Sequence, residues 1–91
     1  MSSRNHFFKP YFTEQERDEL CLWFKEHIDE LPKSMLIDKA IAANDLPATV
    51  RNMVNVLERR DLSRQSTFSG YMSLLMTIRE LVEHPELRPT L

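Results

Sequence analysis

Signals that start and stop helices divide this chain, and they constrain its fold more than any other feature. Thr13 and Glu16 have the spacing of a capping box, in which each side chain accepts a hydrogen bond from the other residue's backbone N–H. Three prolines stand where helices end or begin, in Leu31-Pro32, Asp45-Leu46-Pro47 and His84-Pro85. Apolar residues recur at helical spacing between these signals, so the chain is predicted to be built from helices.

Three main helices are predicted, over residues 13–31, 46–60 and 66–84. Within each range the apolar residues recur every three or four positions, which gives the helix one apolar stripe. The segment 33–44 fits a short helix about as well as it fits an irregular packed segment. No useful length of chain alternates apolar and polar residues, so no β-sheet is predicted. The predicted fold class is all-α, a small bundle of three main helices with or without a short fourth.

Ninety-one residues suffice for a single domain with one core. We expect an N-terminal aromatic arm over residues 1–12, a helical domain over 13–84 and a C-terminal tail over 85–91. The predicted core combines the helical stripes with one residue of the segment between the first two helices: Trp23, Phe24, Ile28, Leu36, Val50, Val54, Leu57, Tyr71, Leu75 and Ile78. Four methionines also occupy positions that suit the core: Met35, Met53, Met72 and Met76.

The composition is that of an ordinary soluble globular chain, with 42% hydrophobic and 29% charged residues. A net charge of −2 argues against a dedicated nucleic-acid binder, which usually carries a basic excess. The polar first residues lack the apolar run of a signal peptide, and no apolar stretch approaches the roughly 18 residues that span a membrane. We therefore expect a cytoplasmic protein that does not contact a membrane.

The chain groups no residues in a pattern that suits catalysis, a cofactor or a metal, and we expect a protein that is not an enzyme. His27-x-x-Glu30 and Glu80-x-x-x-His84 each place a histidine and a carboxylate on one helix face, but a metal site needs three or four ligands. Cys21 is the only cysteine, which excludes an internal disulfide, and the acidic residues around it raise a thiol pKa. One glycine cannot form a phosphate-binding loop, so no small-molecule substrate is evident.

Four aromatic residues precede the first predicted helix: Phe7, Phe8, Tyr11 and Phe12. Pro10 forbids a regular helix there, so we expect an extended arm against the helices. Two interpretations stay open. The arm either covers the small core or docks a protein partner or a second copy of the chain, since aromatic side chains dominate interface energetics. The leading hypothesis is a non-enzymatic interaction module that binds through these residues and the adjoining helix faces.

The alternative is a small DNA-associated regulator with a degenerate helix-turn-helix at about residues 35–60. Residues 41–50 resemble the turn and second helix of that motif, followed by the candidate DNA contacts Arg51, Asn52, Asn55, Arg59, Arg60 and Arg64. The motif separates its alanine and valine by about ten residues, whereas Ala42 and Val50 are eight apart. Because this spacing is wrong and the net charge is acidic, nucleic acid is the less favoured partner.

Helix caps and core positions follow one another in a recognisable order between Leu20 and Val82: Leu31-Pro32, Leu36, Asp45-Leu46, Val50, Met53, Leu57 and Tyr71-x-x-x-Leu75. In this order the chain resembles a family of short bacterial helical domains of unknown function, common in Bacteroidetes. The aromatic arm and the tail lie outside the resemblance. The resemblance implies a compact helical domain from a bacterial cytoplasm, and it implies neither an activity nor functional residues.

Overall fold

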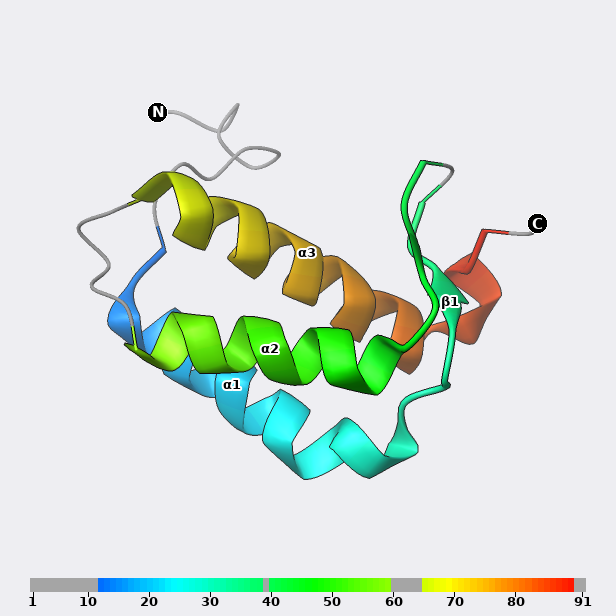
Figure 1. The fold of residues 1–91 in the computed structure, drawn as a ribbon, viewed down its shortest axis with the longest axis horizontal. Coiled ribbons are helices and arrows are strands. Elements are labelled where there is room, and N and C mark those ends of the chain that lie inside the picture. Colours follow the sequence, from blue (N-terminus) through cyan, green and yellow to red (C-terminus); the bar gives the residue numbers. More distant parts are fainter. Residues whose placement is uncertain (1–11, 39, 60–64, 90–91) are drawn as a thin grey trace.

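The computed structural model describes residues 12–38, 40–59 and 65–89. Three α-helices pack together, and a small hairpin stands at one end (Figure 1). The elements follow in the order α1 (Glu14–His27), the short 3-10 helix η2 (Ile28–Glu30), β1 (Met35–Leu36), β2 (Ala42–Ala43), α2 (Leu46–Arg59), α3 (Gln65–Glu83) and the 3-10 helix η3 (Pro85–Leu87). The fold is therefore mainly helical with a minor hairpin, and it is not a strict bundle.

The start of α1 confirms the capping box. The Thr13 hydroxyl accepts a hydrogen bond from the Glu16 backbone N–H at 3.1 Å, and the Glu16 carboxylate accepts one from the Thr13 N–H at 2.9 Å. Two N–H groups that lack partners inside the helix are satisfied in this way. Acidic residues in the first turn also suit the positive end of the helix dipole.

The first helix ends earlier than its predicted limit at Leu31. The α-helix stops at His27, and η2 then carries the chain to Glu30. Leu31 itself is extended, with φ −71° and ψ 140°. The cause is Pro32, whose ring disfavours the helical conformation of the residue before it.

The other two helices lie within one residue of their predicted ends. The Asp45 carboxylate caps α2 by accepting a hydrogen bond from the Ala48 N–H at 3.2 Å, and Pro47 occupies the first turn, where its missing N–H costs nothing. In Figure 1, α2 runs opposite to both α1 and α3, which point the same way. No helix in the described part of the chain is long and apolar enough to cross a membrane.

The prediction of no sheet is wrong. β1 and β2 pair in antiparallel fashion, with Met35 opposite Ala43 and Leu36 opposite Ala42. The Asp38 carboxylate organises the bend by accepting hydrogen bonds from the N–H groups of Ala40 at 2.7 Å and Ile41 at 2.8 Å. An Asp side chain replaces a backbone turn in this way without a glycine.

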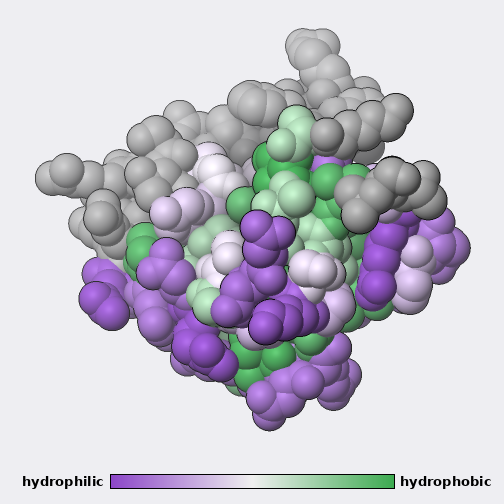
Figure 2. Space-filling model, turned by 45° about the vertical axis from the view of Figure 1, so that its right-hand side comes forward, coloured by the Kyte–Doolittle hydropathy of each residue, from purple (hydrophilic) through white to green (hydrophobic). Residues whose placement is uncertain are grey.

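The hairpin occupies the segment 33–44, for which the sequence left a short helix and an irregular packed segment equally open. Its base is closed by a hydrogen bond of 2.7 Å from the Leu46 N–H to the Lys33 carbonyl. Ile41 and Leu87 expose apolar surface at this end of the molecule. Figure 2, in which this end comes forward, shows green surface between strongly hydrophilic side chains.

Most of the predicted core is confirmed, with corrections at the edges of the stripes. Six predicted residues are buried: Phe24, Val50, Val54, Leu57, Leu75 and Ile78. Four others are only half-buried: Trp23, Ile28, Leu36 and Tyr71. Met35, Met53 and Met72 are buried as predicted, but Met76 is wrongly placed in the core, since 47% of it is exposed. Each fully buried large side chain stabilises the fold by about 1.5–3 kcal/mol relative to its exposed state.

Candidate functional site

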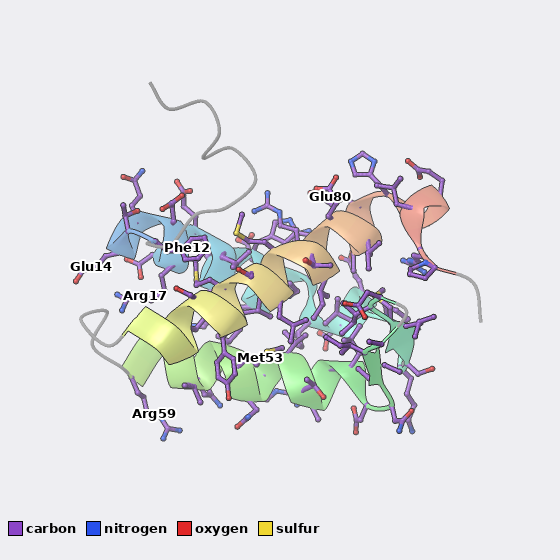
Figure 3. The ribbon with its side chains drawn as sticks, turned by 90° about the horizontal axis from the view of Figure 1, so that it is seen from above. Phe12, Glu14, Arg17, Met53, Arg59 and Glu80 are labelled. Atoms are coloured by element: carbon purple, nitrogen blue, oxygen red, sulfur yellow. The ribbon has the colours of Figure 1, made fainter. Side chains whose placement is uncertain are left out.

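The residues of the predicted aromatic arm divide between described and undescribed parts of the chain. Phe7, Phe8 and Tyr11 lie outside the described residues. Phe12 is 7% exposed and belongs to the core, and Figure 3 labels it at the start of α1. For Phe12 the structure therefore agrees with the interpretation that the arm covers the core.

The candidate DNA contacts gather on one helix, but not in the predicted motif. Arg51, Asn52, Asn55 and Arg59 are exposed on α2, whereas Arg60 and Arg64 lie outside the described residues. A helix-turn-helix over residues 35–60 needs a helix before α2, and the described residues there form the hairpin instead. The helix-turn-helix prediction is therefore wrong in its geometry.

Neither histidine pair belongs to a metal-ligand cluster within the described part of the chain. The His27 Nδ1–H donates to the Trp23 carbonyl at 2.7 Å, and its ring stacks on the Trp23 indole with centroids 4.0 Å apart. His84 is exposed, with its nitrogens 4.0 Å from a Glu80 oxygen and 3.3 Å from a Glu86 oxygen. Among residues 12–38, 40–59 and 65–89, no three histidine, cysteine or acidic side chains form a group that could hold a metal ion.

Cys21 is a buried thiol that ionises with difficulty. It is 2% exposed, and burial raises its pKa from the ordinary 9.0 to about 11, with the negative charge of Glu58 as the next cause. The direction agrees with the sequence prediction, but desolvation is the larger cause and neighbouring acids the smaller. A protonated, buried thiol is a poor nucleophile.

The described surface has a groove of about 350 Å³ between α1 and α3, which we call the α1–α3 groove. Its lining comes from Glu16, Glu19 and Leu20 on α1 and from Met72, Met76, Arg79, Glu80 and Glu83 on α3. The floor is apolar, since Leu20 and Met72 are buried core residues and Met76 leaves about half of its surface open to solvent. The groove therefore offers apolar contact area that a bound side chain can cover.

The rim of the α1–α3 groove is acidic. Among the described residues of the lining, four glutamates face one arginine, which gives a net charge of −3. Arg79 is already engaged, because its Nε lies 3.6 Å from a Glu83 oxygen and its guanidinium lies 5.2 Å from the centre of the Trp23 ring. Figure 3 shows Glu80 projecting from α3. This charge attracts cationic groups to the apolar floor.

A second groove, of about 370 Å³, lies between the hairpin and the C-terminal segment. Arg88 is the charged residue of its lining, and its Nε–H already donates to the Leu81 carbonyl at 2.9 Å. The remaining lining residues are small, apolar or uncharged, so this groove lacks a charge signature that would select a ligand.

The α1–α3 groove was not predicted from the sequence. From the sequence, Glu16 is assigned to the capping box and Glu80 to a pair with His84. The available signal was that acidic residues border the apolar stripe on both helices, at Glu16 and Glu19 and again at Glu80 and Glu83. The groove forms only because helix packing brings the acidic residues of α1 and those of α3 to the same part of the surface.

Comparison with known proteins finds a match to a family model. A family model described as Domain of unknown function (DUF6965) matches residues 15–84, which contain every residue that lines the α1–α3 groove. No curated protein and no solved structure matches the chain.

Proposed function

The chain belongs to the family described as Domain of unknown function (DUF6965), and from its surface we propose that it is a non-enzymatic interaction module. The proposed binding surface is the α1–α3 groove, and the proposed partner is a basic protein segment that carries large apolar side chains. A bacterial cytoplasm is the proposed setting, on the basis of the family resemblance and the composition. No observation favours the DNA-associated alternative, and we do not propose it.

One observation carries the proposal: an apolar floor lies inside an acidic rim. Binding surfaces of proteins commonly have an apolar centre and a polar edge. The partly exposed Met76 belongs to the centre, while Glu19 and Glu80 stand on opposite walls of the edge. A flexible methionine adapts to side chains of different shapes, which suits a peptide-binding floor.

The two parts of the surface contribute differently. An exposed ion pair is worth only about 0–1 kcal/mol, so the rim cannot supply most of the affinity. Covering apolar area contributes about 25 cal/mol per Å² before the costs of association. The floor therefore provides the affinity, and the rim selects cationic partners and speeds their encounter.

The test measures fluorescence anisotropy with a short labelled peptide rich in lysine and phenylalanine. A matched peptide carries glutamate at each lysine position. We expect only the basic peptide to bind, with an affinity that falls as salt rises, since salt screens exposed charges. Equal binding of the two peptides, or no binding of either, would refute the proposal.

Charge reversal on the protein locates the surface. Glu80→Lys replaces an attraction by a repulsion of similar size, so we expect the affinity for the basic peptide to fall about five- to tenfold. Asp29→Lys is the matched control, because Asp29 is exposed in η2 and does not line the groove. If both variants weaken binding equally, the α1–α3 groove is not the binding surface.

A further inference from the structure

We infer that the α1–α3 groove is occupied by the chain's own N-terminal segment, residues 4–9, which an external partner has to displace. The inference rests on the proposed function, because it assigns an occupant to the same surface. It makes the segment an intramolecular competitor that sets how tightly the module binds.

The first support is chemical complementarity. Residues 4–9 read Arg-Asn-His-Phe-Phe-Lys, which combines two permanent positive charges, one histidine and two phenylalanines without an acidic residue. The groove presents the opposite pattern, a net charge of −3 around an apolar floor. The segment thus has the chemistry that the proposed function requires of a partner.

The second support is the point at which the segment joins the domain. Phe12 is buried in the core directly before α1, and Glu16, the first groove residue of α1, stands only one helical turn further on. The chain before Phe12 therefore starts from the same end of the molecule as the groove. Pro10 is a residue that favours a change of direction at that point.

The third support is length. From Met72 to Glu83 the groove follows α3 for about 16 Å, at 1.5 Å of rise per residue. Six extended residues cover about 20 Å, so residues 4–9 match the groove. A tether this short gives an effective concentration in the millimolar range, which populates the docked state even when the intrinsic affinity is weak.

Disulfide trapping in the full-length chain tests the inference. Asn5→Cys is combined with Met76→Cys in the groove, and in the control chain with Asn55→Cys, which is exposed on α2. The native Cys21 does not interfere, because it is buried. We expect the Met76 pair to form a disulfide within one chain at least about tenfold faster than the Asn55 pair, which corresponds to about 1.4 kcal/mol of preference. Glu80→Cys replaces Met76→Cys if the latter chain does not fold.

Similar rates for the two pairs would overturn the inference, and a disulfide-linked dimer as the main product would assign the groove to a second copy instead. Arg4→Glu with Lys9→Glu gives an independent readout. This variant should bind the external basic peptide several-fold more tightly, since its competitor is weakened. An unchanged affinity would refute the competition alone, whereas absence of peptide binding in both chains would refute the proposed function itself.

Discussion

Two methionines one helical turn apart on α3 provide a matched test of the packing. Both are predicted from the sequence to lie in the core, but Met72 is 1% exposed and Met76 is 47% exposed. Met72→Ala and Met76→Ala remove the same atoms and change helix propensity equally, so intrinsic helix preference cancels between them. The difference between the two variants therefore reports burial alone.

The expected losses follow from what each side chain leaves behind. Met72→Ala removes buried surface and opens a cavity in the core, a change that costs about 2–5 kcal/mol in folding stability. Met76 is already about half exposed, so Met76→Ala loses only about half of the transfer free energy of the side chain, roughly 1 kcal/mol. We expect Met72→Ala to be less stable than Met76→Ala by about 2 kcal/mol.

Urea denaturation, followed by far-UV circular dichroism and by the fluorescence of Trp23, measures the two free energies of unfolding. Coincident transitions for the two probes and an unchanged m-value justify a two-state comparison. For a domain with about 5–10 kcal/mol of total stability, the loss of about 2–5 kcal/mol in Met72→Ala should lower the Tm by roughly 8–40 °C. Equal losses for the two variants would refute the reasoning, because they would show that exposure does not distinguish the two sites.

Three further predictions concern single sites. Asp45→Ala should lower the free energy of unfolding by about 1 kcal/mol, because the Ala48 N–H loses its cap, while Asp45→Asn should retain most of it; equal effects in urea melts would contradict the capping role. Gly70→Ala should raise the same free energy by about 0.5–1 kcal/mol, since among the described residues only its chain neighbours and the adjacent backbone of α3 can lie within 4 Å of a Cβ built at Gly70; a destabilised variant would reveal a hidden contact. Cys21 should resist a thiol reagent at pH 8 until urea unfolds the chain. The pKa of Cys21 rises from 9.0 in the unfolded chain to about 11 in the folded chain. The protonated thiol should therefore contribute fully to the free energy of unfolding below pH 9, and this contribution should disappear as the pH rises through 11. A free energy of unfolding that does not change across that range would argue against burial of Cys21.

The helices were predictable because their signals are local. Thr13 with Glu16 and Asp45 with Ala48 fix helix starts through contacts three residues apart, and such contacts depend little on the rest of the fold. The burial of residues in the middle of each apolar stripe, such as Phe24, Val54 and Leu75, was predictable because it follows from the local spacing of apolar residues. The stripe edges were not, since the exposure of Met76 depends on how closely α1 approaches α3.

The hairpin and the groove were not predictable because their determinants are nonlocal or weak. Two residues per strand are too few to display alternation, and the only turn signal was Asp38, an acidic residue among many. Glu19 and Glu80 lie far apart in the sequence, so nothing local shows that they border one hollow. Their relative placement is decided by helix packing.

The backbone contact between Lys33 and Leu46 has a consequence for how this family can vary. Residues 34–45 leave the helical framework and return to it at nearly the same point, so their number is not dictated by the distance between α1 and α2. Extra or missing residues at the bend near Asp38 would lengthen or shorten the hairpin without displacing the three helices. That bend is where relatives should differ most in length, and where an epitope tag could be inserted with the least damage to folding.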